Sequence, residues 1–93
     1  MLDPKEALSA IQKAVRDVLN NQSLTITLES KLMDDLGLES IDLLDVSSEL
    51  ENTTGKELDF KEVADFVKNR SGGAASLKNV KVQDLVEYLA ANS

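Results

Sequence analysis

The stretch Asp34-Asp35-Leu36-Gly37-Leu38-Glu39-Ser40-Ile41-Asp42 decides how this chain of 93 residues folds. Its glycine can adopt a positive φ and turn the chain sharply into a run of apolar residues with helical spacing. Ser40 therefore stands at the start of a helix, with carboxylates on both sides. The chain contains no histidine that could activate this hydroxyl. The segment indicates a point of attachment rather than the nucleophile of an enzyme.

The helix that follows is predicted to run from about Ser40 to Thr53, with Gly55 as its C-terminal stop. At about 100° per residue it has three stripes. The core-facing stripe consists of Leu43, Val46, Ser47 and Leu50. A second stripe, on the far side, consists of Ile41, Leu44 and Ser48, and an acidic stripe consists of Asp42, Asp45 and Glu49. An apolar strip rimmed by charge is typical of a docking surface, although the aliphatic residues could instead pack beneath a neighbouring loop.

Three more helices are predicted outside this segment. Asp3-Pro4-Lys5-Glu6 reads as a helix start, and the first helix should extend to about Asn20. A third, shorter helix should follow the cap Asp59 and use Phe60, Val63 and Val67 on one face, with a loop from Arg70 to Ala75 after it. The last helix should end near Ala91, with Asn79 a better cap than Lys81.

The segment between the first two helices alternates apolar Leu24, Ile26 and Leu28 with threonines, as a strand would. No second alternating run exists to pair with it, so we expect an extended loop that lays these side chains on the core. The predicted fold is all-α: a small four-helix bundle, residues 1–93 forming one domain, with a short third helix and a long loop between helices one and two.

Charge and composition exclude several function classes. The segment from Glu29 to Glu51 holds eight acids against one lysine, which equals the net charge of −7 for the whole chain. This disfavours nucleic acid and favours a partner with a basic patch. No apolar run is long enough to span a membrane, and the absence of cysteine fits a cytoplasmic protein. No metal-binding motif is present, although divalent cations could associate weakly around Asp34, Asp35 and Glu39.

The run Asp35-Leu36-Gly37-Leu38-Glu39-Ser40-Ile41 resembles the 4′-phosphopantetheine attachment motif of acyl carrier proteins. The likeness covers nearly the whole chain, including the acidic second helix and the closing Val82-Gln83-Asp84-Leu85-Val86. It implies that a phosphopantetheinyl transferase joins the arm of coenzyme A to Ser40, and that the arm's thiol then carries acyl groups as thioesters. The chain would be a substrate and partner of enzymes, not an enzyme itself.

By the same resemblance, one surface of the second helix and the preceding loop would meet acyl-processing enzymes of fatty-acid or related biosynthesis through their basic patches. The residues implied are Asp35, Glu39, Ile41, Asp42, Leu44, Asp45, Ser48 and Glu49. Such a carrier would act as a monomer.

Departures from the family pattern keep alternatives open. Glu39 replaces a more usual aspartate, Ser48 replaces a larger apolar residue, the loop from Arg70 to Asn79 is long, and Lys81 replaces a threonine. A specialised carrier for a polyketide or lipid-modifying pathway is one alternative. An acidic helical adaptor that is never modified, with Ser40 as a plain N-cap, is another.

Overall fold

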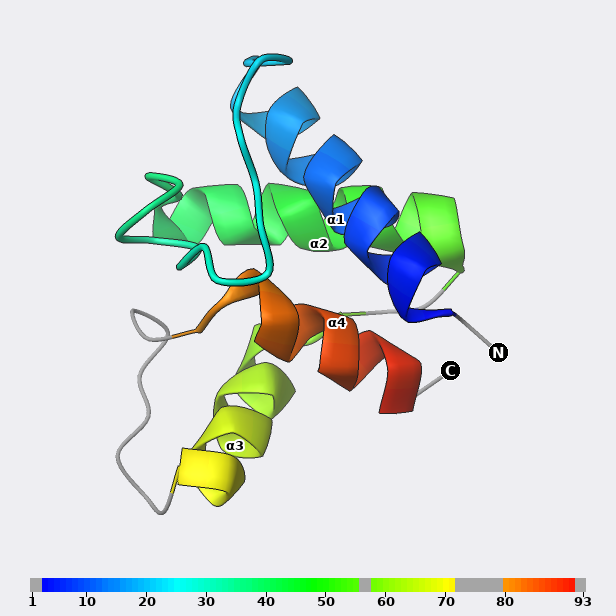
Figure 1. Cartoon of the computed structure of the whole chain (residues 1–93), viewed down its shortest axis with the longest axis vertical. Helices are drawn as coiled ribbons and strands as arrows, with labels where there is room; N and C mark the ends of the chain where they lie inside the picture. Colours follow the sequence, from blue (N-terminus) through cyan, green and yellow to red (C-terminus); the bar gives the residue numbers. More distant parts are fainter. Residues whose placement is uncertain (1–2, 56–57, 72–79, 92–93) are drawn as a thin grey trace.

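The computed structural model describes residues 3–55, 58–71 and 80–91, except for the side chains of 67–71. Within these ranges the chain forms four α-helices: α1 (Pro4–Val18), α2 (Ser40–Thr54), α3 (Phe60–Ser71) and α4 (Val82–Ala91). α1 packs against both α2 and α4, and α3 packs against α4 (Figure 1). The only β pairing in the described part of the chain is one isolated antiparallel bridge between Lys31 and Lys81. The predicted all-α bundle is confirmed.

α1 begins as the sequence predicts and ends earlier. Asp3 is the N-cap, and its carboxylate accepts the Lys5 N–H at 3.0 Å. Asn20 takes a φ of 53°, in the left-handed region that interrupts a helix. Its N–H and that of Asn21 donate back to carbonyls of the last turn, so the helix stops at Val18 instead of near Asn20.

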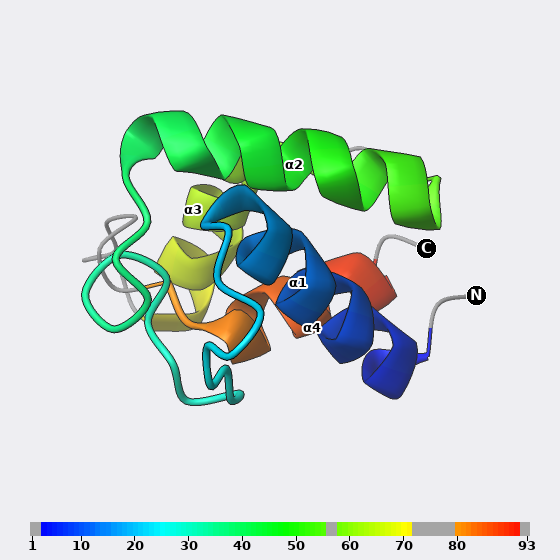
Figure 2. The same ribbon diagram turned by 90° about the horizontal axis from the view of Figure 1, so that it is seen from above.

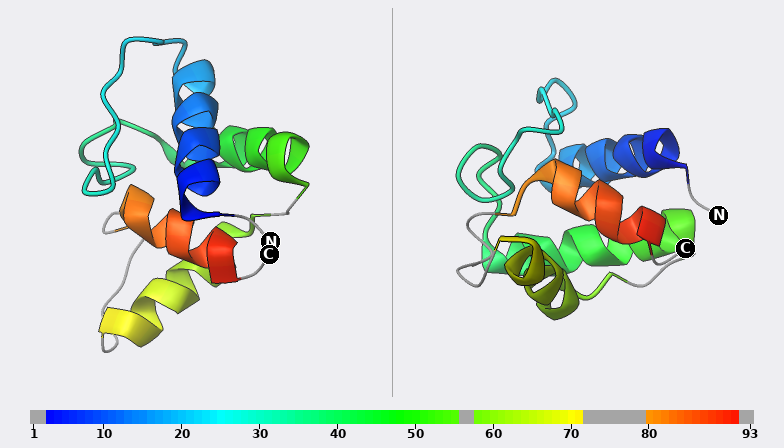
Figure 3. Two further views of the ribbon diagram at one scale, coloured as in Figure 1. Left: turned by 45° about the vertical axis from the view of Figure 1, so that its right-hand side comes forward. Right: turned by 60° about the horizontal axis from the view of Figure 1, so that its bottom comes forward.

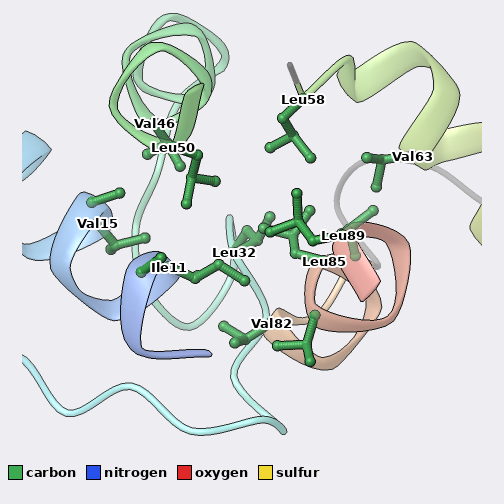
Figure 4. Packing of buried hydrophobic residues seen from close by; sticks show 14 of the residues in the cluster. Ile11, Val15, Leu32, Val46, Leu50, Leu58, Val63, Val82, Leu85 and Leu89 are labelled. Atoms are coloured by element: carbon green, nitrogen blue, oxygen red, sulfur yellow. The ribbon is translucent and has the colours of Figure 1, made fainter. Parts of the chain in front are cut away.

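The helices enclose one aliphatic core (Figure 4). The predicted α2 stripe is confirmed for Leu43, Val46 and Leu50, which are buried. Ser47, the fourth member, is half-buried and donates its hydroxyl to the Leu58 carbonyl, which joins α2 to the segment before α3. The core also contains Leu58, Val80 and Tyr88, which belong to none of the helical stripes predicted from the sequence.

The long loop between α1 and α2 is held from both sides. From α1, the Gln12 amide donates to the Ile26 carbonyl and the Arg16 Nε donates to the Leu24 carbonyl, both at 3.0 Å. Ile26 is buried and Leu24 is partly buried, as expected. The expectation for Leu28 was wrong, because its side chain is 40% exposed.

Leu28 contributes its backbone instead. The first N–H groups of α4, those of Val82 and Gln83, donate to the carbonyls of Ser30 and Leu28 at 2.9 and 3.0 Å. In Figure 1 the loop descends from the end of α1 to the start of α4 before it turns toward α2. A distant stretch of backbone thus caps α4. The residue before the helix is Lys81, whose N–H donates to the Asp84 carboxylate, and Asn79 lies outside the described residues.

α3 starts at the predicted cap, with the Lys61 N–H donating to the Asp59 carboxylate at 2.9 Å. Glu62 accepts the Tyr88 hydroxyl and so ties α3 to α4. The two helices lie side by side in both views of Figure 3. At 12 residues α3 is shorter than α1 and α2, with 15 each, but longer than α4, with 10. The helix includes Arg70 and Ser71, which were expected in the loop, and the rest of that loop and the side chain of Val67 lie outside the described residues.

Candidate functional site

A compact turn leads the chain into α2. The Lys31 carbonyl accepts the N–H groups of Asp35 and Leu36, both at 3.1 Å, and the Leu32 carbonyl accepts that of Leu38 at 3.1 Å. Gly37 has a φ of 76°, a backbone conformation that costs residues with a side chain more free energy. The positive φ predicted for this glycine is confirmed. Leu36 and Leu38, on either side of it, are both buried. The alternation of apolar residues about the glycine was the available signal for these two anchors.

Ser40 is the first residue of α2, and Glu39 takes the capping position in an extended conformation. The reading of Ser40 as a plain N-cap is therefore wrong. The Ser40 side chain is exposed, and its hydroxyl forms no hydrogen bond within the part of the chain that the structure describes. The backbone N–H groups of a first helical turn lack partners inside the helix. An exposed hydroxyl thus lies at the positive end of a helix dipole.

The eight residues implied as a partner surface lie on the turn and on α2. Glu39, Ile41, Leu44, Asp45 and Ser48 are exposed, as is Asp35, whereas Asp42 and Glu49 are half-buried. Ile41 and Leu44 are 66% and 68% exposed, so neither packs beneath a neighbouring loop. The arrangement is an exposed apolar pair directly after the serine, with carboxylates beside it.

Asp35 and Asp42 bind backbone N–H groups, and Glu39 completes a capping box with Asp42. The Asp35 carboxylate accepts the Lys31 N–H at 2.8 Å, and the Asp42 carboxylate accepts the Glu39 N–H at 2.9 Å. Asp45 and Glu49 have no bonded partner among the described residues, and neither forms an ion pair with a lysine or arginine there. In the sequence, Asp35, Asp42, Asp45 and Glu49 all indicate one acidic surface, and no local pattern predicts this division.

Within residues 3–55, 58–71 and 80–91, no group of three or more acidic side chains is arranged to hold a metal ion. No helix of that part of the chain is long and apolar enough to cross a membrane.

The residues around Ser40 fit a phosphate ester. The hydroxyl is exposed and is not engaged in capping its own helix, and the unpaired N–H groups of the first turn favour an anionic phosphate. The neighbouring carboxylates oppose that charge, but exposed charges are screened at physiological salt. Ser40 could therefore hold a phosphodiester-linked group.

Comparison with known proteins agrees with this chemistry. Residues 9–69 match a family model described as a phosphopantetheine attachment site. A protein of Onion yellows phytoplasma named acyl carrier protein is 34% identical over 84 residues, which cover 89% of this chain and 92% of that protein. Another of the same name, from Thermotoga maritima, is 32% identical over 59 residues, or 63% of this chain and 73% of the relative.

Proposed function

The chain belongs to the acyl carrier protein family, whose cofactor is 4′-phosphopantetheine, and we propose that Ser40 is the residue to which this group is joined. The observation that carries the proposal is the exposed hydroxyl of Ser40 at the first position of α2, without a bonded partner in the described structure. When bound, the group supplies a thiol that carries acyl chains as thioesters.

Ser40 acts as the substrate of the attachment reaction. Its Oγ forms a bond to phosphorus, a phosphoanhydride bond of coenzyme A breaks, and the nucleotide leaves with the electron pair. The sequence has no histidine, and no carboxylate of the described residues bonds the Ser40 hydroxyl, so we expect the phosphopantetheinyl transferase to supply the base that takes the serine proton. The chain contributes an accessible hydroxyl and the N–H groups that favour a phosphate at a helix start.

The partner surface comprises Ile41 and Leu44 as apolar contacts and the carboxylates along the turn and α2 as charged contacts. The carboxylates are Asp35, Glu39, Asp42, Asp45 and Glu49, and Ser48 lies on the same surface. Opposite charge on a partner accelerates encounter, and a small apolar contact allows rapid release. These properties suit a carrier that visits several acyl-processing enzymes in turn.

The pathway is fatty-acid or related acyl-chain biosynthesis, with the protein acting as a cytoplasmic monomer of one domain. Ser48 supports a second candidate, a specialised carrier for a polyketide or lipid-modifying pathway. This small, exposed hydroxyl gives the far side of α2 less apolar area than a larger residue would. Incubating the acyl-loaded protein with enzymes of each candidate pathway distinguishes the two functions. The enzyme that accepts the acyl group from the carrier identifies the pathway.

Intact-mass measurement after incubation with coenzyme A and a promiscuous phosphopantetheinyl transferase tests the attachment. The wild-type protein should gain the mass of one phosphopantetheinyl group, and Ser40→Ala should gain none. Ser23→Ala, which alters another exposed serine, serves as the control and should be modified like the wild type. No gain by the wild type, or a gain by Ser40→Ala, would favour the unmodified adaptor.

A further inference from the structure

We propose that Asp35 and Asp42 are positioning residues that hold the backbone on the two sides of Ser40, and that this role distinguishes them from Asp45 and Glu49 on the same acidic surface. This inference rests on the proposed attachment at Ser40 and deepens it. A docking charge acts through its charge alone, whereas a positioning carboxylate acts through the hydrogen bond that it accepts.

On the upstream side, Asp35 closes the turn that carries the chain to α2. Its carboxylate accepts the Lys31 N–H at 2.8 Å while its own N–H donates to the Lys31 carbonyl at 3.1 Å, so the two residues are linked twice. Hydrogen bonds to a charged acceptor are stronger than neutral ones. The turn ends at Leu38, whose buried side chain anchors the backbone immediately before Glu39 and Ser40.

The same turn is attached to the rest of the fold at its first residues. The Leu32 N–H donates to the Val80 carbonyl at 3.0 Å, and the Val82 N–H donates to the Ser30 carbonyl at 2.9 Å. Lys31, whose amide Asp35 holds, lies between these two bonds. Asp35 therefore connects a stretch anchored on α4 to the start of α2.

On the downstream side, Asp42 holds Glu39. Its carboxylate accepts the Glu39 N–H at 2.9 Å, one residue before the serine. Glu39 is extended, with φ −98° and ψ 169°, and the Glu39 carbonyl accepts the Leu43 N–H. The bond from Asp42 thus fixes the change from extended to helical backbone at Ser40, the first residue of α2. Figure 2 shows the loop entering α2 at this end of the helix.

Asp45 provides the matched comparison. It lies one turn further along α2, is exposed, and has no bonded partner in the described structure. The three aspartates therefore share a charge and a surface, and differ in whether the carboxylate accepts a backbone N–H.

Paired substitutions separate the two roles. Asp→Asn removes the charge and keeps an oxygen that can accept the N–H, whereas Asp→Ala removes both. At Asp35 and at Asp42, the Asn variant should be modified by the transferase about fivefold or more faster than the Ala variant, as expected for loss of a capping bond. At Asp45 the Asn and Ala variants should lose the same factor, and this pair also controls for helix propensity.

The measurement is kcat/KM for phosphopantetheine transfer, with circular dichroism showing that each variant is folded. Equal rates for the Asn and Ala variants would overturn the positioning role at that residue, while the wild type's own modification would still support the attachment at Ser40.

Amide hydrogen exchange of the unmodified protein tests the inference without the transferase and without relying on the Ala variants. In the wild type, the Lys31 and Glu39 amides should exchange more slowly, relative to their intrinsic rates, than the Ser40 amide at the open end of the helix. Equal relative rates would overturn the inference whether or not Ser40 is ever modified.

Discussion

The hydroxyl of Ser40 has no hydrogen-bond partner among the described residues, because Glu39, one residue earlier, takes the capping position of α2. A serine at the N-cap accepts an N–H of its own helix, and modification of its oxygen would disturb that cap. At the first helical position the side chain is not needed to accept an N–H of the helix. A shift of one residue therefore separates a structural serine from one that can be modified without cost to the helix.

The positive φ of Gly37 yields a prediction at the same scale. Gly37→Ala should destabilise the fold by about 1–2 kcal/mol, because an L-residue at a φ of 76° is strained. An added Cβ would meet no atom within 4 Å, so the cost is one of backbone conformation alone. Chemical denaturation measures the loss of stability, and it should be accompanied by slower modification of Ser40, since the turn sets the approach to the helix.

Gly55 supplies the control for that prediction. It has a φ of 73°, has equally open surroundings, and lies at the opposite end of α2 from Ser40. Gly55→Ala should lose similar stability and leave the modification rate as in the wild type. If both variants slowed modification equally, the effect would be one of general stability rather than of the turn.

At the scale of the element, α2 has a buried face and an exposed apolar face, each containing a leucine. Leu50 is completely buried and Leu44 is 68% exposed. Leu50→Ala should cost about 2–5 kcal/mol of stability through lost burial and a cavity. Leu44→Ala should lower the melting temperature only slightly and should weaken binding to the transferase.

Thermal melting and a binding titration on the same two variants provide the measurement. Equal losses of stability would contradict the assignment of faces, and unimpaired binding by Leu44→Ala would remove this leucine from the docking surface.

The carboxylates of α2 that have no bonded partner in the described structure are predicted to steer partners. Replacing Asp45 and Glu49 together by lysine should slow association with the transferase, most strongly at low salt, because salt screens exposed charges. Stopped-flow rates over a range of salt concentration test this. Glu6→Lys with Asp65→Lys makes the same change in net charge on other helices and should have a smaller effect. Rates independent of salt would leave the acidic edge with a solubilising role only.

The helices themselves were predictable because their apolar spacing is a local property of the sequence. The period placed Leu43, Val46 and Leu50 on the buried face of α2, and Asp3 and Asp59 marked two helix starts. The cap of α4 was not predictable, since backbone carbonyls have no residue signature. Nor could the sequence separate Asp35 and Asp42 from Asp45, because that difference arises only when the turn closes.

At the scale of the whole molecule, the long loop joins elements that are distant in sequence. It receives side-chain donors from α1 and gives carbonyls to the start of α4 before it forms the turn that leads to Ser40. Although the loop contains no helix or strand, its hydrogen bonds to α1 and α4 thus help to hold the bundle together. The position of the serine depends on α1 and α4 as well as on α2.

Arg16 provides the test of this dependence. Its Nε donates to the Leu24 carbonyl at 3.0 Å in a partly buried setting, so Arg16→Ala should cost about 1–3 kcal/mol by leaving that carbonyl without its donor. Hydrogen exchange followed by mass spectrometry should show faster exchange across residues 24–32, and also at the first N–H groups of α4, whose acceptors lie in the same loop. Lys13→Ala removes an equal charge from an exposed position on α1 and should leave both regions as protected as in the wild type. Faster exchange in the loop without any change at α4 would mean that the two attachments act independently, and that α1 does not help to fix the start of α4.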